Sequence, residues 1–425
     1  MKKRVVVTGI GIVSPNGIGQ ETFTQALKQG ISGLRHFPEL EALEFGCQVG
    51  GIPDISQSTF KSWLELYNLI TASQMIQYAV IAGLEAWTDA GFKIPETPDS
   101  PPDYDTGAII GTGIGTIDIY GERIIPITNQ KIIKKLRSTI VEHSMLSGGS
   151  ATLSSILGLG NRLSANSSAC NTGTESIIEA FERIQSGKAL RMMAGASEPY
   201  SPWHWSPFDA MRVTTRSFNQ EPSKASRPMS ATASGFVPSS GAGMLILEEL
   251  ETARQRNAPI YAEILGGFIN SGGQRNGGSM TAPSSEGVIR CIHGALENAN
   301  AEPQEIDLIS GHLSSTMADP LEISNWSLAL NRKGKDFPYI NATKSLVGHT
   351  IGAAGVIETI AALMEMKNSF IHPSLNCEDL HPDIARILSP ERIPHQAINN
   401  ININCFAKAS FGFGDVNSCI IFKKL

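Results

Sequence analysis

Apolar and polar positions alternate along this chain in a way that predicts interleaved strands and helices. Short apolar runs that end in glycine or polar turns predict strands, and longer segments with apolar residues three or four positions apart predict helices. The predicted strands cover about 3–9, 105–111, 190–196, 241–248, 260–266, 306–310 and 418–422. The predicted helices cover about 20–29, 71–91, 175–184, 249–254, 285–299 and 352–364. This order predicts an α/β fold.

The order of elements begins again near residue 259. Each half carries a strand, a loop of small residues, and a polar turn that opens a buried helix. We interpret this as an internal duplication of one α/β unit, with an N-terminal half over 1–255 and a C-terminal half over 256–425. Residues 117–160 have no counterpart in the second half, so we expect an insertion there. Two core-forming units also suit a chain of 425 residues.

Cys170 stands at the start of one predicted helix. The segment 165–174 holds only small and polar residues around it, and apolar residues recur at helical spacing over 177–184. At a helix N-terminus, unpaired backbone N–H groups and the helix dipole favour a thiolate over a thiol, which predicts a nucleophile. Since free cysteine is also among the most buried residue types, a purely structural role stays open at this point.

Lys344 and His349 occupy the corresponding polar turn of the second half, and His312 lies on the loop before it. A duplicated fold brings two such turns together near a pseudo-twofold axis. A cysteine nucleophile with imidazole N–H donors suits acyl transfer, because the donors face the oxygen on which negative charge develops. Each histidine alone could be structural. Their joint position favours a catalytic role.

Composition and charge exclude several classes of function. The net charge of -6 argues against nucleic acid as a partner. Six cysteines are scattered without a CxxC pair, which favours a reducing compartment and no disulfide framework. Cys377 and His381 are too few for a zinc site, so we expect no metal. No uncharged run reaches the ~18 residues needed to span a bilayer, and we expect a cytoplasmic protein without a membrane partner.

Two motifs resemble those of the β-ketoacyl-acyl carrier protein synthases, the elongating type I/II ketosynthases. The sequence SACNTG over 168–173 resembles their cysteine motif, and TKSLVGH over 343–349 resembles their lysine and histidine motif. Supporting matches lie at 1–17, 226–228, 235–237, 241–249, 280–283 and 410–414. The resemblance covers essentially the whole chain. It implies a thiolase-like fold, with two duplicated α/β halves in five αβαβα layers.

The resemblance implies an acyltransferase, a 3-oxoacyl-acyl carrier protein synthase. Its reaction is the decarboxylative Claisen condensation of malonyl-acyl carrier protein with an acyl group held by Cys170, in fatty acid or in polyketide or polyene elongation. His312 and His349 are expected to stabilise the enolate. Lys344 and Glu322 are expected to form a supporting charged pair. No cofactor is expected, because the substrate arrives on the phosphopantetheine arm of the carrier protein.

The same resemblance implies roles around the nucleophile. The backbone N–H groups of Cys170 and Phe413 are expected to form the oxyanion hole, and Phe413 to gate the acyl pocket. The expected substrate-binding residues are Thr281, Ser314, Thr316 and Phe411. An acidic carrier protein should dock on exposed cations despite the net negative charge of the chain. The expected docking residues are Lys134, Lys135, Arg137 and Arg212. A dimer is expected, either of two identical chains or with a related ketosynthase-like chain.

Three departures from the family pattern suggest a side branch of it. Residues 311–316 read GHLSST where the family has AHGTST, and the loop on to Glu322 is one residue shorter. Gly414 is followed by Asp415 instead of glycine, and Ser234 replaces an acidic residue. Two other classes of protein share this pattern in part. A non-catalytic, chain-length-determining partner subunit lacks the nucleophile, and a coenzyme A thiolase has a second active-site cysteine where this chain has 411–413.

Overall fold

A single mixed sheet forms the centre of the protein. The computed structural model describes residues 2–57, 60–97 and 100–425. The strands of this sheet are β1 (Val5–Ser14), β2 (Gly17–Ile18), β5 (Thr106–Gly111), β6 (Leu163–Ser164), β7 (Arg191–Glu198), β8 (Gly241–Glu249), β9 (Ala262–Ser271), β10 (Leu308–Ser310), β11 (Tyr339–Asn341), β14 (Cys405–Gly412) and β15 (Val416–Lys423). Their order is β11-β10-β14-β15-β9-β1-β8-β7-β5-β6, and β2 pairs with β1.

The sheet consists of two parts joined by a short seam. β1 pairs antiparallel with β8 along most of its length, but it pairs with β9 only from Val5 to Val7. On one side of the seam, β5, β7 and β8 come from the first half of the chain. On the other side, β9, β15, β14, β10 and β11 come from the second half. The short seam allows the two parts to face each other across a layer of helices.

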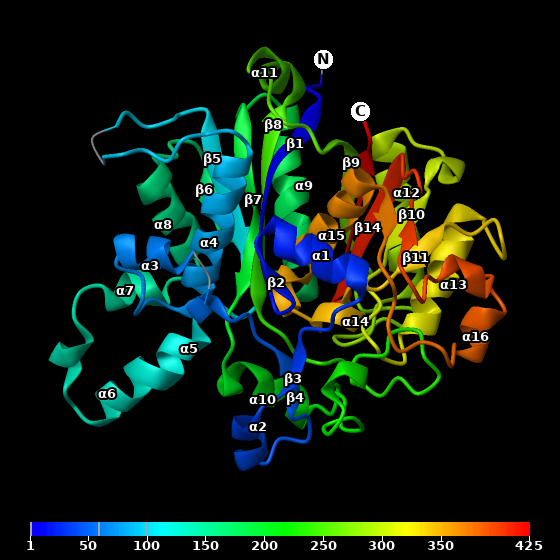
Figure 1. Ribbon diagram of the computed structural model, residues 1–425, viewed down its shortest axis with the longest axis horizontal. Helices are drawn as coiled ribbons and strands as arrows, with labels where there is room; N and C mark the ends of the chain where they lie inside the picture. The colour runs from blue at the N-terminus through cyan, green and yellow to red at the C-terminus, as the bar shows by residue number, and fades with distance from the viewer. Residues whose placement is uncertain (1, 58–59, 98–99) are drawn as a thin grey trace.

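Helices fill the space between the two parts of the sheet and cover both outer faces (Figure 1). The inner helices are α9 (Thr172–Gln185) and α15 (Ala354–Asn368). α9 contacts β5 and β7 on one side and β9 and β15 on the other. The outer layers contain α4 (Gln74–Asp89) with α8 (Gly148–Leu157), and α12 (Ser285–Ala299) with α13 (Asp319–Leu330). The predicted αβαβα thiolase-like fold is confirmed.

The two inner helices begin in the same way, which confirms the duplication. A 3-10 turn, η4 (Ala169–Asn171), precedes α9, and another, η7 (Ile351–Ala353), precedes α15. The first residue of each turn has a positive φ angle, 52° at Ala169 and 48° at Ile351. A Cβ atom added to Gly173 would lie 2.8 Å from the Val356 nitrogen, and one added to Gly355 would lie 2.7 Å from the Thr174 nitrogen. The helix N-termini therefore cross with backbone nearly touching backbone.

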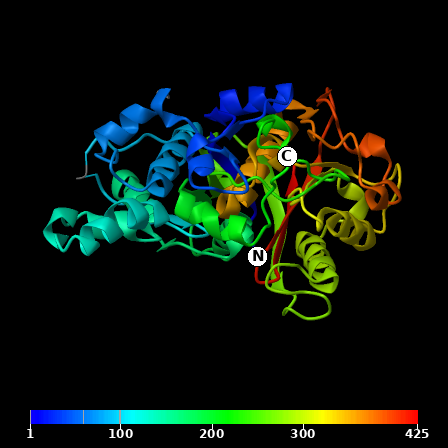
Figure 2. The ribbon, with the colours of Figure 1, turned by 90° about the horizontal axis from the view of Figure 1, so that it is seen from below.

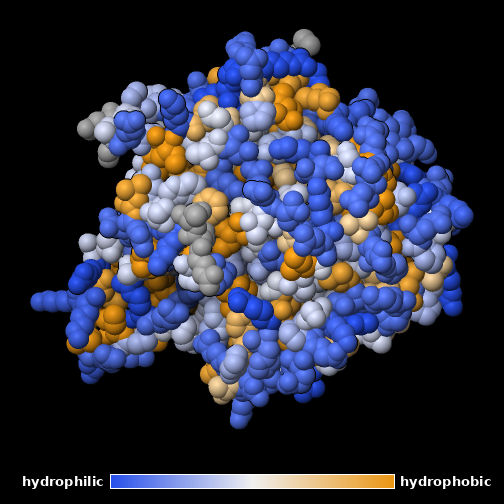
Figure 3. Space-filling view, in the orientation of Figure 1, coloured by the Kyte–Doolittle hydropathy of each residue, from blue (hydrophilic) through white to orange (hydrophobic). Residues whose placement is uncertain are grey.

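The segment 117–144 projects from this body. It contains α5 (Ile117–Ile119), η2 (Tyr120–Ile124), α6 (Ile125–Asn129), η3 (Ile133–Leu136) and α7 (Ile140–Ser144). The segment lies at the edge of the molecule in both ribbon views (Figure 2). Hydrophobic side chains gather on its surface (Figure 3), and Ile133 is 63% exposed. The rest of the predicted insertion forms α8, which packs against α4 and β5 in the core.

Two long strands, β1 and β14, show how the structure differs from the sequence-based prediction. β1 continues through Gly9 and Gly11 to Ser14, because these glycines lie directly against α4. An added Cβ atom at Gly11 would lie 1.9 Å from the Ala82 carbonyl oxygen. No strand was predicted over 404–417, yet β14 pairs with both β10 and β15.

The remaining strands form two small sheets, β3 (Leu34–His36) with β4 (Val49–Gly51) and β12 (Phe370–Ile371) with β13 (Ile398–Asn399). Within the described ranges, no helix is both long enough and apolar enough to cross a membrane.

Candidate active site

A cavity of about 400 Å³ reaches Cys170 from the surface. The predicted site residues that line it are Cys170, Thr281, His312, Ser314, Thr316, Glu322, His349, Phe411 and Phe413. Most of the other lining side chains are apolar, among them Phe208, Val213 and Phe236. The cavity therefore suits an extended, mostly apolar group that ends at a polar reaction centre.

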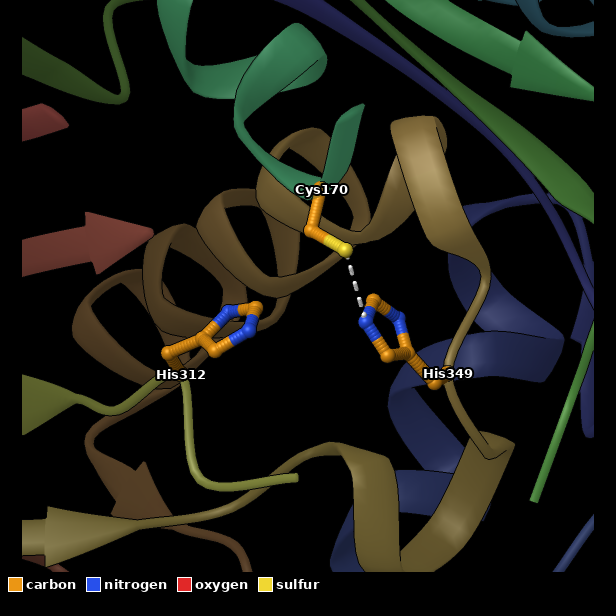
Figure 4. Close-up of side chains that lie close together, drawn as sticks. All are labelled: Cys170, His312 and His349. Carbon is orange, nitrogen blue, oxygen red and sulfur yellow. Dashed lines mark hydrogen bonds between the residues drawn. The ribbon is translucent and has the colours of Figure 1, made fainter. Parts of the chain in front are cut away.

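The thiol and two imidazoles converge at the inner end of this cavity (Figure 4). Cys170 comes from the turn η4, His349 from the turn before α15, and His312 from the loop after β10. The Nε2 atom of His349 lies 3.1 Å from the Cys170 sulfur. Ligand atoms of all three residues lie within 4.8 Å of one another. Residues from both halves of the chain thus meet at one point, as the duplication predicts.

Burial around Cys170 favours the thiol, which opposes the effect expected from its position at a helix start. Burial raises its pKa to about 11. The charge of Lys344 and the backbone N–H of Phe413 lower the pKa, but they do not outweigh desolvation. The same backbone N–H is the one expected to complete the oxyanion hole.

Hydrogen bonds fix the tautomers of both histidines. The backbone N–H of Ile351 donates to Nδ1 of His349 at 3.1 Å, so a neutral His349 carries its proton on Nε2. The Lys344 ammonium lies 3.4 Å from Nδ1 of His312, which leaves the proton of His312 on Nε2 as well. Burial lowers the pKa of both histidines well below 6.5. The site therefore presents two neutral imidazoles as N–H donors.

The ion pair expected between Lys344 and Glu322 is wrong. Lys344 Nζ instead lies 2.5 Å from Glu358 Oε1 and donates to the carbonyl oxygen of His312, also at 2.5 Å. The two oxygens of Glu322 accept the backbone N–H groups of His312 and Leu313, each at 2.7 Å. Glu322 therefore holds the His312 loop through its backbone, and Glu358 is the partner of the lysine.

The departure GHLSST is compensated locally. Leu313 is fully buried and has a φ angle of 22°. Its side chain lies where a residue larger than Gly311 would need space, since an added Cβ atom at Gly311 would lie 2.7 Å from Leu313 Cδ1. Asp319 holds the rest of the loop by accepting the backbone N–H groups of Ser314 at 2.9 Å and Ser315 at 3.1 Å. Compared with the family pattern AHGTST, the smaller side chain stands at 311 and the larger one at 313. The loop nevertheless keeps His312 in place.

Asp415 compensates the second departure. It has a φ angle of 58°, a conformation that aspartate tolerates better than most residues. Its buried carboxylate accepts the backbone N–H groups of Gln274 at 2.9 Å and Ser284 at 2.8 Å. These bonds fasten the segment 272–284, which carries Thr281 at the wall of the cavity. At the third departure, the Ser234 hydroxyl lies 2.7 Å from the Thr215 hydroxyl.

The four expected docking residues lie outside the cavity. Lys134, Lys135 and Arg137 are exposed on and after η3, in the projecting segment. Arg212 is exposed just after α10 (Pro202–Ala210). Their exposure leaves them accessible to a partner.

Sequence reasoning missed several charged residues of the site. Glu358 and Lys408 stand inside apolar stretches that form α15 and β14, and a charge within such a stretch is the signal that could have revealed them. Glu198 lies buried behind the site and accepts from Gly113, Ile114 and Gly352. The sulfur of Cys170 and the ring nitrogens of His312 and His349 are also close enough together to bind a metal ion. The expectation that none is needed stays a prediction.

The αβαβα layers and the thiol with its two imidazole donors identify a class, the thiolase-like enzymes that transfer acyl groups through a cysteine. Comparison with known proteins agrees with this class. Residues 2–253 match the Beta-ketoacyl synthase, N-terminal domain, and residues 261–378 match the Beta-ketoacyl synthase, C-terminal domain. The chain belongs to the beta-ketoacyl synthase family.

Relatives of similar length support this assignment. The chain is 33% identical to 3-oxoacyl-[acyl-carrier-protein] synthase 2 of Vibrio harveyi, over 100% of this chain and 99% of the relative. It is 35% identical to 3-oxoacyl-[acyl-carrier-protein] synthase 1 of Buchnera aphidicola, over 99% of this chain and 100% of the relative. It also resembles a solved structure of a type II PKS acyl-carrier protein in complex with its ketosynthase bound to the hexaketide, with a TM-score of 0.87, 29% identity and 100% coverage of both chains. It resembles the solved structure of the ishigamide ketosynthase/chain length factor with a TM-score of 0.87, 25% identity and 100% coverage of both chains.

Proposed function

We propose that this protein is a condensing acyltransferase, which joins a malonyl unit on an acyl carrier protein to an acyl group held on Cys170 and releases 3-oxoacyl-acyl carrier protein and CO2. The observation that carries the proposal is the Cys170 thiol, 3.1 Å from an imidazole N–H of the other half, at the inner end of an apolar cavity. The names of the relatives, 3-oxoacyl-[acyl-carrier-protein] synthases, support it.

In the first stage, the acyl group moves from the phosphopantetheine thiol to Cys170. The bond between the Cys170 sulfur and the acyl carbon forms, the pantetheine thioester bond breaks, and the proton of Cys170 passes to the departing thiol. The His349 Nε2–H and the backbone N–H of Phe413 face the sulfur and stabilise it as it loses its proton. We assign Phe413 and Cys170 as the source of the oxyanion hole, and Phe413 as the gate.

In the second stage, malonyl-acyl carrier protein enters the vacated cavity. Its carboxylate leaves as CO2, and the resulting enolate carbon forms a bond to the acyl carbon while the bond from that carbon to the Cys170 sulfur breaks. Cys170 leaves as a thiolate and takes up one proton from water, which restores the thiol. His312 and His349 donate from Nε2 to the enolate oxygen, and each such donor is typically worth ~3 kcal/mol. Burial lowers the pKa of both histidines well below 6.5, so near pH 7 each donates as a neutral imidazole through its Nε2–H.

Further assignments follow from the position of each residue in the cavity. Ser314 and Thr316 have hydroxyls 3.0 Å apart on the wall of the cavity, and we assign them with Thr281 to the pantetheine arm. Phe411, 7% exposed, lies beside the His312 ring and contributes to the substrate wall. The half over 1–255 supplies the acyl nucleophile, and the half over 256–425 supplies the groups that handle the malonyl unit.

We assign acyl carrier protein as the partner, docked on Lys134, Lys135, Arg137 and Arg212. Two solved structures support a partner of this kind, since one contains a ketosynthase with its acyl-carrier protein and the other is a ketosynthase/chain length factor. We expect a dimer with an identical or related chain, and a protein of the cytoplasm. The products enter fatty acid elongation or polyketide and polyene elongation.

The test combines intact-protein mass spectrometry with product analysis. The wild-type protein, incubated with acyl carrier proteins of graded acyl length, should gain the mass of the acyl group, and malonyl-acyl carrier protein should then release 3-oxoacyl-acyl carrier protein. Cys170→Ala should gain no mass. Cys291→Ala is a matched control in a buried cysteine outside the cavity, and it should load normally. Acyl mass that persists on Cys170→Ala would show that the nucleophile is another residue.

A further inference from the structure

A second lysine lies buried behind the reaction centre. Lys408 stands on β14, is fully buried, and lies with its Nζ atom 2.8 Å from Glu358 Oε2. The other oxygen of Glu358 is held by Lys344 at 2.5 Å. Lys408 Nζ also donates to the carbonyl oxygen of Ala409. One buried carboxylate is therefore shared by two buried lysines from different elements.

This arrangement places two lysine side chains against one carboxylate behind the site. Glu358 can neutralise one of the two ammonium groups. Glu322 also faces Lys408, and burial raises its pKa to about 7, so it carries only part of a negative charge near pH 7. Buried charges are costly unless they are paired, and burial lowers the pKa of Lys408 while the charge of Glu358 opposes this shift, so Lys408 depends on Glu358 to remain a cation.

We propose that Lys408 is a positioning residue of the condensing site, which takes up the charge of Glu358 and thereby leaves the charge of Lys344 free to stabilise an anion at Cys170. Lys344 connects the two places, since its Nζ atom contacts Glu358 and also lies 3.4 Å from the His312 ring. Glu358 raises the Cys170 pKa and Lys344 lowers it. Lys408 offsets the rise in the Cys170 pKa that Glu358 causes, and it preserves the fall that Lys344 causes.

The groups that face this cluster come from several elements. Lys408 faces Glu358 from α15, Lys344 from α14 (Lys344–Val347) and Glu322 from α13. The charge of Lys408 also lowers the pKa of His312, His349 and Cys419. Cys170 itself faces Lys344, Glu358 and Glu198, and His349 through a hydrogen bond. Among these groups, Lys408 and Glu358 oppose each other, so removing one or the other should shift the Cys170 pKa in opposite directions.

The experiment measures the alkylation rate of Cys170 by iodoacetamide against pH, followed by mass spectrometry of the peptide that contains Cys170. In Lys408→Met, the apparent pKa of Cys170 should rise by about one unit, which is about ten-fold slower alkylation at a fixed pH below it. Glu358→Gln should shift the apparent pKa downward. Lys423→Met is the matched control, because it also removes one lysine charge but at the exposed end of β15, and it should leave the profile unchanged.

A simple loss of packing cannot produce shifts of opposite sign. The proposal is overturned if Lys408→Met folds and leaves the Cys170 profile unchanged, or if Glu358→Gln shifts it upward. Where Lys408→Met does not fold, Lys408→Gln, which keeps an N–H donor for the Ala409 carbonyl oxygen, should give the same upward shift, and an unchanged profile would overturn the proposal. The proposal rests on Cys170 as the nucleophile, but alkylation requires no turnover. Failure here therefore differs from failure of acyl loading, which would overturn the proposed function itself.

Discussion

The turn that carries Cys170 and the turn that precedes α15 have the same backbone but different chemistry. Each begins with a residue of positive φ, makes one 3-10 turn, and continues into a helix that crosses the other at a glycine. In the first turn, the residue after the strained position is Cys170. In the second, the corresponding residue is Gly352, and the functional groups lie before it, at Lys344 and His349.

The charge buried by the two helices differs as well. α9 buries small and apolar residues, whereas α15 buries Glu358 and Glu365 among its apolar ones. Burial raises the pKa of Glu365 to about 8, and this residue accepts from Asn341 and from the backbone of His372. A duplicated backbone has thus been used twice, once to expose a nucleophile and once to support the charges around it.

The largest expected effect is a slower condensation step when a histidine of the second half is removed. His312→Ala should slow condensation about 100- to 1000-fold, because one of two donors to the developing enolate is lost. Acyl loading of Cys170 should change by only a few-fold, and rapid-quench assays of the two stages would separate these effects. His293→Ala is the matched control, since His293 lies on α12 and bonds to the carbonyl oxygen of Ala329. Equal losses in both stages would remove the proposed division of labour.

The crossing of the two helices should be the next most sensitive feature. Gly355→Ala adds a methyl group 2.2 Å from the Thr174 hydroxyl and should lower the free energy of unfolding by about 1 to 3 kcal/mol, the usual cost of overpacking. Denaturant titration at fixed protein concentration measures this. Gly187→Asn serves as the control for steric effects, because nothing among the described residues lies within 4 Å of an added Cβ atom there, and asparagine tolerates its φ angle of 73° better than most residues do. A neutral Gly355→Ala would mean that the crossing is loosely packed.

Glu198 joins the loop after β5 to the turn before α15 and should make stability depend on pH. Burial raises its pKa from 4.5 to about 8, so the folded state favours the protonated carboxyl. The stability from this preference is complete below pH 4.5 and is lost as the pH rises through about 8. Glu198→Gln should flatten the decline of Tm between pH 5 and 8 in thermal melts. Glu251→Gln, an exposed position on α11 (Leu250–Gln255), should leave the slope unchanged.

The smallest expected effect concerns carrier protein docking. Reversing Lys134 and Lys135 to Glu should raise the KM for acyl carrier protein several-fold and leave kcat nearly unchanged, because rim charges mainly affect encounter. Steady-state kinetics at two salt concentrations measure this, and the difference should shrink at high salt. The paired reversal of Lys333 and Lys335, exposed on another face, is the control. An unaltered KM would place the docking surface elsewhere.

Much of this site could be predicted from the sequence. Cys170, Lys344 and His349 are carried by short contiguous motifs, so local order was enough to find them. Most helices also followed their periodicity closely, and α12 has the predicted bounds, Ser285–Ala299.

The parts that could not be predicted depend on three-dimensional contacts. The partner of Lys344 is set by which carboxylate lies beside it, and Glu358 and Glu322 are equally plausible in sequence. No strand was predicted at β14 because small residues and Lys408 interrupt its apolar pattern, yet its neighbours β10 and β15 pair with it along the sheet. The thiol state of Cys170 also depends on burial, which a helix-start pattern does not report.

Gly311 and Leu313 have an evolutionary consequence. Leu313 fills the space that a larger residue at 311 would occupy, so Gly311→Ala alone creates a clash and Leu313→Gly alone leaves a cavity. Made together, the two changes relieve each other, which is the signature of an epistatic pair. The route between the family pattern and this loop therefore passes through a less stable intermediate sequence, and neither position can drift freely once the exchange has been made.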